Sequence, residues 1–211
     1  MQKIVVVDYG MGNLRSVAKA LEFVAREHSL PVEVAVSSSR MQVDEADRVV
    51  FPGQGAMPDC MRYLAESGLE ESVRRAALIK PFFGVCVGMQ MLFDHSEEGG
   101  TAGLGLFDGA VKRFRPTDAS QKVPHMGWNT VVQTQAHPLW QDIVNDERFY
   151  FVHSFYCEPA DRSVTAAMTD YTRPFAAAIA RDNIFATQFH PEKSHRAGLT
   201  LYKNFLLWTP A

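Results

Sequence analysis

The stretch at residues 82–90 holds the residue types that a covalent catalyst needs. Cys86 stands between Gly84 and Gly88 in a G-x-C-x-G pattern, the thiol counterpart of the G-x-S-x-G turn that exposes a nucleophilic serine between a strand and a helix. Glycines on both sides suit the strained backbone of such a turn. A helix that begins at Val87 would aim backbone N–H groups at the sulfur, which favours the thiolate and offers a donor to an oxyanion.

A base for this thiol could come from the sequence His190-Pro191-Glu192. If the segment is the end of a strand, His190 and Glu192 project to the same face, and Pro191 is tolerated between them. A histidine can take the thiol proton and later protonate a leaving nitrogen, while a carboxylate fixes the tautomer of the histidine. The chain order Cys, His, Glu differs from the Ser, Asp, His order of α/β-hydrolases, which weakens that alternative. The other alternative is a histidine without a role beside a solvated carboxylate.

The elements that must position these residues alternate between strand and helix in the first half of the chain. The predicted strands are residues 3–8, 32–36, 48–51 and 81–85, and the predicted helices are residues 14–27, 56–66, 69–79 and 87–94. Such alternation is typical of a parallel sheet covered by helices. Cys86 therefore lies at the carboxyl end of a predicted buried strand.

The second half of the chain is richer in strands. The predicted strands are residues 109–113, 128–132, 148–153, 163–168, 175–180 and 184–188, with a hairpin turn at 181–183 and an amphipathic helix at 196–207. We therefore expect one α/β domain spanning residues 1–211. Its central, mostly parallel sheet is flanked by helices and gains antiparallel additions in the C-terminal half.

Composition gives no reason to expect several classes of protein. The 211 residues include 46% hydrophobic and 21% charged residues, with a formal net charge of -3, which is ordinary for a globular protein and gives no footprint for nucleic acid or an anionic membrane. The three cysteines, Cys60, Cys86 and Cys157, are scattered, so we expect neither a disulfide framework nor a metal site. Without a signal peptide or a membrane-spanning run, we expect a cytoplasmic protein that needs no cofactor. We interpret Cys60 and Cys157 as buried, inert thiols. For Cys86, a buried, inert thiol is the alternative to a nucleophile.

Six blocks of the sequence, in order, resemble the class I (triad-type) glutamine amidotransferase family, whose marks are G-x-C-x-G and a later H-P-E. The blocks are residues 8–14, 52–55, 82–90, 124–129, 150–154 and 190–194. The resemblance covers essentially the whole chain and implies a single-domain, flavodoxin-like fold. The start of the chain and the block PHMGWN are similar to one branch in particular, the glutaminase subunits that serve histidine biosynthesis.

The resemblance implies a mechanism and a set of binding residues. Cys86 would attack the side-chain amide carbon of glutamine, with His190, oriented by Glu192, acting as base and then as acid, and water would hydrolyse the glutamyl thioester to glutamate. The residues implied in oxyanion and substrate binding are Gly53, Val87, Gln90, Glu98, Ser154 and Phe155. Glu98 suits the substrate ammonium, although acidic residues close together usually form a solvated loop, and Gln90 could be an ordinary polar helix residue.

The same resemblance implies a partner for the released ammonia, a separate cyclase subunit with a (β/α)8 barrel that would form a heterodimer with this chain. The positions that match the subunit interface are Met126, Trp128, Asn129, Tyr150 and Lys193. Two residues depart from the family pattern: Gln54 replaces a common valine in the oxyanion loop, and Phe155 replaces a frequent tyrosine.

Two other functions stay open from the residues alone. The first is a glutaminase that serves another synthase, such as those for anthranilate, guanylate or pyridoxal phosphate. The second is a silent binding or redox protein in which Cys86 is oxidised as a sensor. The His190 and Glu192 pair argues against the sensor, because a sensor needs no general acid.

Overall fold

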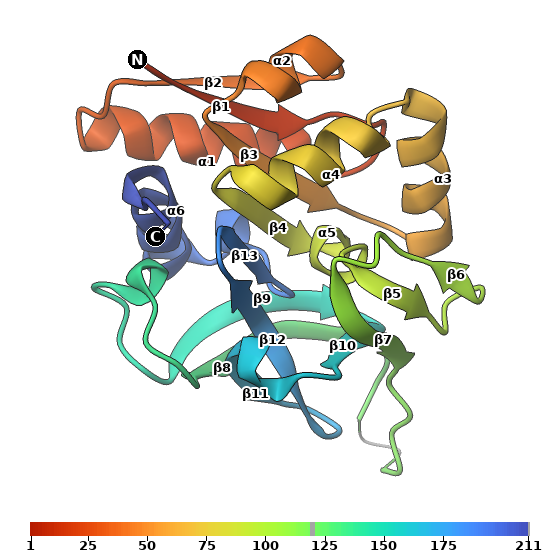
Figure 1. Ribbon diagram of the computed structural model, residues 1–211. Helices are drawn as coiled ribbons and strands as arrows, with labels where there is room; N and C mark the ends of the chain where they lie inside the picture. The colour runs from red at the N-terminus through yellow and green to blue at the C-terminus, as the bar shows by residue number, and fades with distance from the viewer. Residues whose placement is uncertain (119–120, 211) are drawn as a thin grey trace.

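The computed structural model describes residues 1–118 and 121–210, and its elements alternate as expected in the first half (Figure 1). The helices are α1 (Leu14–Glu27), α2 (Arg40–Glu45), α3 (Met57–Ser67), α4 (Glu70–Ile79), α5 (Val87–Gln90) and α6 (His195–Leu207). The strands of the first half are β1 (Gln2–Val7), β2 (Val32–Ser37), β3 (Arg48–Gly53), β4 (Phe82–Cys86), β5 (Phe93–Ser96) and β6 (Thr101–Ala102). Those of the second half are β7 (Phe107–Arg113), β8 (His125–Gln133), β9 (Glu147–His153), β10 (Phe155–Pro159), β11 (Thr165–Asp170), β12 (Pro174–Arg181) and β13 (Ile184–Thr187).

The main sheet joins a parallel half to an antiparallel half. Its nine strands run in the order β2-β1-β3-β4-β13-β12-β11-β8-β9, and the first five are parallel neighbours. The order β2-β1-β3-β4-β13 is the 2-1-3-4-5 order of flavodoxin-like folds. A second sheet, β10-β7-β5-β6, lies beside the antiparallel half (Figure 1). The predicted α/β fold with late antiparallel additions is confirmed.

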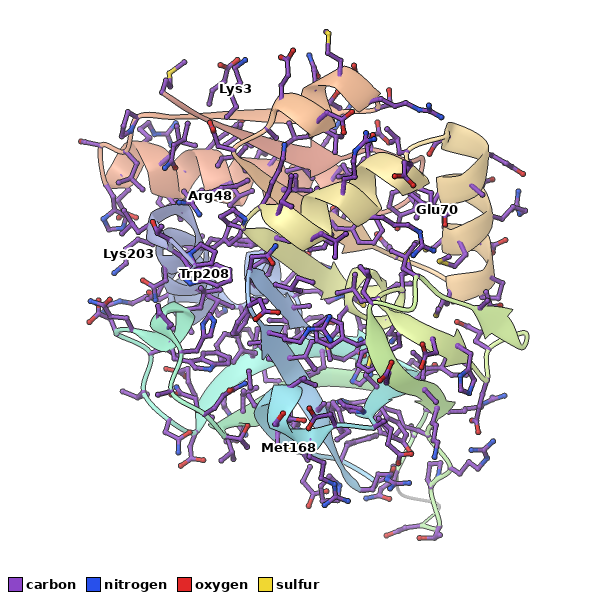
Figure 2. All side chains as sticks on the ribbon, viewed as in Figure 1. Lys3, Arg48, Glu70, Met168, Lys203 and Trp208 are labelled. Atoms are coloured by element: carbon purple, nitrogen blue, oxygen red, sulfur yellow. The ribbon has the colours of Figure 1, made fainter. Side chains whose placement is uncertain are left out.

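Burial explains why the parallel strands form the centre. Every residue of β3 and β4 is buried, as expected for strands covered on both faces. Helix α1 buries a stripe that includes Val17, Leu21 and Val24, and it packs beside α6. Arg48, at the start of β3, donates hydrogen bonds to the Trp208 carbonyl and to Gln2, which fastens the end of the chain to the sheet (Figure 2).

Three local predictions were wrong. The helix expected at residues 87–94 ends after one turn, and Phe93–Ser96 is the strand β5, because the N–H groups of Leu104 and Leu106 bond the carbonyls of Met91 and Leu92. Strand β3 continues through Pro52 to Gly53 instead of ending at Phe51. The strand expected at 163–168 begins at Thr165, after a 3-10 turn at Arg162–Val164. Helix α2 and strands β6 and β10 were not predicted.

Candidate active site

Cys86 occupies a strained turn at the carboxyl end of β4. Its φ of 55° lies in the left-handed region that residues with a Cβ rarely adopt. A Cβ on Gly88 would lie 2.0 Å from the Phe51 carbonyl oxygen, and one on Gly84 would lie 2.8 Å from the Ala186 Cβ. The glycines of the G-x-C-x-G pattern therefore let the turn pack against β3 and β13. Because α5 is a single turn, the helix beside the sulfur is much shorter than we predicted.

The sheet brings the histidine to this turn. Strand β13 pairs with β4 in parallel, with Thr187 beside Val85. His190 comes shortly after the end of β13, so it lies at the same edge of the sheet as Cys86, the last residue of β4. The backbone of His190 is fixed on both sides: its N–H donates to the Tyr150 carbonyl (3.0 Å) and its carbonyl accepts from Ser194 Oγ (2.6 Å). Residues about 100 positions apart in the sequence thus meet at the carboxyl ends of neighbouring strands, where open α/β sheets bind ligands.

His190 and Glu192 form a buried pair. His190 Nδ1 lies 2.9 Å from Glu192 Oε1, and both side chains are almost fully buried. The geometry differs from our prediction, because Glu192 sits in a 3-10 turn, Pro191–Lys193, and not on a strand. Asn13 Nδ2 and Tyr202 OH each approach the same carboxylate at 3.5 Å, so the carboxylate has a fixed orientation.

The environment of His190 raises its affinity for a proton. Burial lowers the pKa of His190, but the negative charges of Cys86 and Glu192 and the hydrogen bond to Glu192 raise it, and the net rise is from 6.5 to about 10. With Nδ1–H directed at Glu192, the buried Nε2 makes no hydrogen bond of good geometry among the described residues, yet it lies close enough to Cys86 to sense its charge. A histidine so placed suits the removal of the thiol proton.

Gln188 joins Cys86 to the wall of the pocket, and it was not predicted from the sequence. Its Nε2 lies 3.8 Å from Cys86 Sγ, and its Oε1 accepts from Gln90 Nε2 at 3.0 Å. Gln90 Nε2 also donates to the Phe155 carbonyl at 3.1 Å. The available signal was a polar residue just beyond the four buried residues of β13, two positions before His190.

A cavity of about 300 Å³ opens over the sulfur. Its lining residues are Gln54, Gly55, Cys86, Val87, Gln90, Glu98, Val152, His153, Ser154, Phe155, His190 and Lys193. The predicted residue Gly53 lies behind this wall, where a Cβ would come within 2.5 Å of Gly88 N. Glu98 also accepts a hydrogen bond from Met57 N (2.8 Å) at the start of α3, so it has a structural partner in addition to its place in the cavity.

The residues expected at a partner interface separate onto two faces of the β8–β9 pair. Met126 and Trp128 are 63% and 40% exposed, Trp128 pairs across the strands with Tyr150, and Lys193 Nζ lies 5.8 Å from the centre of the Tyr150 ring. Because side chains alternate along a strand, Asn129 points to the opposite face, where it donates to the Asp170 carbonyl (2.8 Å).

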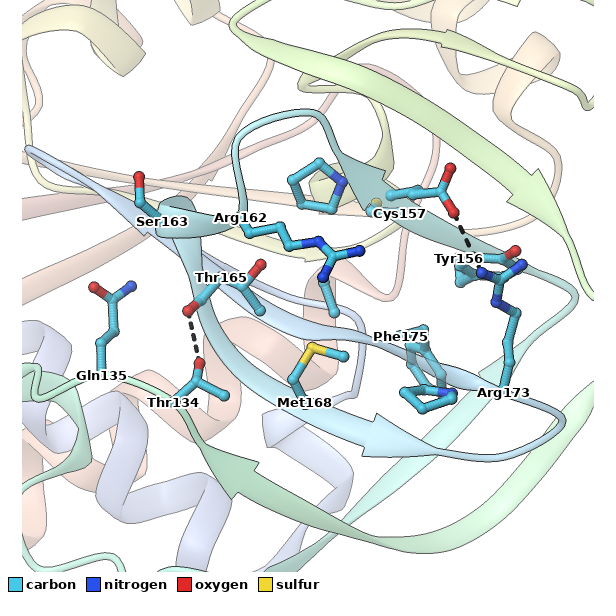
Figure 3. A pocket seen from close by; sticks show the side chains of 14 residues that line it. Thr134, Gln135, Tyr156, Cys157, Arg162, Ser163, Thr165, Met168, Arg173 and Phe175 are labelled. Carbon is cyan, nitrogen blue, oxygen red and sulfur yellow. Dashed lines mark hydrogen bonds and ion pairs between the residues drawn. The ribbon is translucent and has the colours of Figure 1, made fainter.

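A second hollow, of about 590 Å³, lies between β10 and the β11–β12 hairpin (Figure 3). Its walls include Met168 and Phe175, and it holds none of the predicted catalytic residues. Cys157 lies in its wall, fully buried, and burial raises the pKa of that thiol. A thiol whose pKa is raised is a poor nucleophile at neutral pH, so the smaller cavity over Cys86 is the better candidate for the active site.

The described part of the chain contains neither a cluster of metal ligands nor a helix that could span a membrane. Within residues 1–118 and 121–210, no three His, Cys, Asp or Glu side chains gather as a metal site would require. Among the helices of those residues, none is both long and apolar enough to cross a membrane.

Comparison with known proteins gives consistent results. A sequence model of the family described as "Glutamine amidotransferase class-I" matches residues 5–208. The chain is 58% identical to a protein of Nitrosospira multiformis named imidazole glycerol phosphate synthase subunit HisH, and the alignment covers 100% of each chain. It is 56% identical to a protein of the same name from Chromobacterium violaceum, and that alignment covers 98% of each chain. A crystal structure of a putative GMP synthase component from Thermoplasma acidophilum is 21% identical with a TM-score of 0.69, over 98% of this chain and 92% of that one, which shows a shared fold.

Proposed function

The chain belongs to the class-I glutamine amidotransferase family, and from that premise we propose that it is the glutaminase subunit of an imidazole glycerol phosphate synthase in histidine biosynthesis. It hydrolyses L-glutamine to L-glutamate and ammonia, and the ammonia passes to a cyclase. One observation carries the proposal: a cysteine and a histidine line one cavity, with a glutamate bonded to the histidine, in a chain that matches the relatives of that name over its full length. The same match supports one glutamine amidotransferase domain over residues 1–211.

The arrangement of Cys86, His190 and Glu192 supports a two-step covalent reaction. His190 Nε2 takes the proton of the Cys86 thiol, and the sulfur attacks the side-chain amide carbon of glutamine. The carbon–nitrogen bond then breaks, and ammonia leaves with a proton from His190. Water, deprotonated by His190, attacks the glutamyl thioester and releases glutamate and the free thiol. Glu192 holds Nδ1–H throughout, so that Nε2 always faces the sulfur.

The negative oxygen of each tetrahedral intermediate needs donors. We assign this role to the backbone N–H of Val87 and to a backbone N–H of the loop at residues 52–55, which includes Gly53. Two side chains beneath this loop fasten its carbonyls: Tyr9 OH donates to Pro52 O (3.0 Å) and Cys60 Sγ to Gln54 O (3.3 Å). These two bonds hold the loop in place beside Cys86.

The walls of the cavity suit the polar ends of glutamine. Glu98 would pair with the substrate ammonium, and Gln90, held by Gln188 and the Phe155 carbonyl, would also contact the substrate. The backbone of Ser154, which joins β9 to β10, and that of Phe155, the first residue of β10, offer further polar groups. Phe155 contributes a ring without a hydroxyl, so its contact with the substrate is by backbone and apolar surface alone.

The exposed face of β8 and β9 supports a docking site for the cyclase, a (β/α)8 barrel. Met126, Trp128 and Tyr150 make an aromatic and apolar patch, and Lys193, which contacts Tyr150, also lines the glutamine cavity. A partner seated there would lie at the mouth of the site, where ammonia leaves. We place the complex in the cytoplasm, since all three cysteines are free and buried.

The proposal is tested by glutamate release from the chain alone and with the cyclase and its nucleotide ligand. We expect strong stimulation by the complex and no turnover by Cys86→Ala. A wild-type chain that hydrolyses glutamine equally well without the cyclase would remove the assignment to this synthase. A chain that hydrolyses no glutamine under any of these conditions would remove the glutaminase itself and favour the redox sensor.

A further inference from the structure

Two buried histidines link β8 and β9 beneath the glutamine cavity. His125 Nδ1 lies 3.0 Å from His153 Nε2, and His153 Nδ1 lies 2.7 Å from the Phe155 carbonyl oxygen. At the other end, Asn129 Nδ2 lies 3.2 Å from His125 Nε2. The four groups form an unbroken line of hydrogen bonds from β8 to the first residue of β10.

The hydrogen positions along this line follow from its two ends. The Phe155 carbonyl can only accept, so His153 Nδ1 carries a proton. Asn129 Nδ2 also donates to the Asp170 carbonyl, while its Oδ1 accepts from Thr130 N, so the amide orientation is fixed and Nδ2 donates to His125. His125 Nε2 is therefore an acceptor and its Nδ1 a donor to His153 Nε2. Both rings are neutral, and each carries its proton on Nδ1.

Packing prevents either ring from turning. His125 is stacked between Tyr171 and Phe151, with ring centres 4.0 Å and 5.0 Å away, and Phe114 meets both histidines edge to face. Burial lowers the pKa of His125 to about 4 and that of His153 to about 3, so both stay neutral near pH 7. The cost of burying two imidazoles is offset only if their hydrogen bonds are made.

The line of hydrogen bonds ends on the carbonyl oxygen of Phe155, a residue that also lines the glutamine cavity. The Phe155 carbonyl accepts from both His153 Nδ1 and Gln90 Nε2, and Gln90 is the residue that Gln188 connects to Cys86 Sγ. His153, Phe155 and Gln90 all line the cavity. The orientation of this carbonyl therefore sets the position of the Gln90 side chain.

We propose that His125 and His153, as two Nδ1–H tautomers in a one-directional hydrogen-bond line, are positioning residues that fix the Phe155 carbonyl and the Gln90 side chain for glutamine binding. That the pocket binds glutamine rests on the function proposed above. Neither histidine exchanges a proton in the reaction. His125 acts entirely through His153, because it is absent from the cavity wall.

The first test reads the tautomers directly. Long-range ¹⁵N–¹H correlation spectra of the full-length wild-type chain near pH 7 should show His125 and His153 protonated at Nδ1 only. Assignment uses His125→Asn and His153→Asn spectra. A proton on Nε2 of either ring, or a charged ring, would overturn the proposal. This result does not depend on whether the chain is a glutaminase.

The second test separates positioning from packing, with glutamate release measured in the complex with the cyclase. His125→Leu removes the donor to His153 and should raise the KM for glutamine about fivefold to tenfold, with kcat changed less than about twofold. His125→Asn places an amide N–H where Nδ1–H was and should restore KM to within about twofold of wild type. Val131→Ala, on the same buried face of β8, is the control, and should lower the melting temperature without raising KM.

Each outcome of the second test separates a positioning role from a packing role. An equal change of KM in His125→Leu and Val131→Ala would show that the histidines contribute only to packing. Failure of His125→Asn to restore KM would show the same. If His125→Leu does not fold, the tautomers of the wild-type chain still decide the matter. If the wild-type complex hydrolyses no glutamine, the proposed function fails, while the tautomer result stands on its own.

Discussion

Replacing Glu192 by glutamine isolates the contribution of its negative charge. The carboxylate accepts from His190 Nδ1 and Asn13 at Oε1 and from Tyr202 at Oε2. A glutamine amide with its oxygen in the Oε1 position keeps the first two bonds, and the Tyr202 hydroxyl can rotate to accept from the amide N–H. Glu192→Gln should therefore keep the fold and the Nδ1–H tautomer of His190, and lose only the charge.

The size of the effect follows from the strength of the bonds. A hydrogen bond to a charged partner contributes about 1.5–3 kcal/mol and a neutral one about 1 kcal/mol, so the change removes about 0.5–2 kcal/mol from transition-state stabilisation. That corresponds to a loss of about twofold to thirtyfold in kcat/KM. Because the Glu192 charge raises the pKa of His190, its removal lowers that pKa and moves the alkaline limb of the rate profile to lower pH.

The assay is steady-state glutamate release by the complex between pH 6 and pH 10, with melting temperatures measured in parallel. Glu192→Ala is the matched comparison, since it leaves His190, Asn13 and Tyr202 without their acceptor and should cost more in both rate and stability. Wild-type kcat/KM in Glu192→Gln would remove Glu192 from the catalytic group. Equal losses in the two variants would refute the view that the charge and the hydrogen bonds contribute separately.

Two further predictions concern the fold around the site. Gly88→Ala should lower the free energy of unfolding in urea by at least about 3 kcal/mol, because its Cβ would overlap the Phe51 carbonyl. Gly100→Ala is the control: its Cβ would meet nothing within 4 Å, so the substitution should cost only about 1 kcal/mol for the positive φ. Similar losses in the two variants would contradict the steric explanation. Burial lowers the pKa of His125 and His153 below 6.5, so the stability that they contribute is present above about pH 6.5 and is lost as the pH falls toward their folded-state values. Unfolding free energy should fall by roughly 2 kcal/mol for each of these histidines between pH 7 and pH 5, and His125→Asn should flatten that slope; an unchanged slope would show that His125 is not buried as a neutral ring.

The position of Cys86 in a tight turn at a strand end was predictable because its signal is local. A glycine on each side of Cys86 and a strand before it are written within nine residues, and the structure adds only the steric reason, the contacts of Gly88 and Gly84 with β3 and β13. His190 and Glu192 were found from their spacing, although the turn that joins them is 3-10 and not a strand. His190 itself precedes the turn with an extended backbone, and its Nδ1 still reaches Glu192 Oε1.

Features that depend on distant segments could not be predicted. The run Met91-Leu92-Phe93 continues the apolar pattern of a helix, but backbone bonds from residues 104–106 end the helix after one turn. Gln188 is a polar residue at a strand end like many others, and its importance comes from Cys86 and Gln90, about 100 positions earlier. The inward direction of Asn129 depends on the register of β8 against β9, which the sequence does not specify.

The central claim is that Cys86 carries the glutamyl group. The most direct measurement is acid quenching of the complex with the cyclase during turnover of glutamine, followed by mass spectrometry of the peptide that contains Cys86. We expect this peptide to gain the mass of one glutamyl group in a bond that hydroxylamine cleaves, and Cys86→Ala to gain none. Turnover at the wild-type rate with no adduct on Cys86, or an adduct on Cys60 or Cys157, would contradict the account.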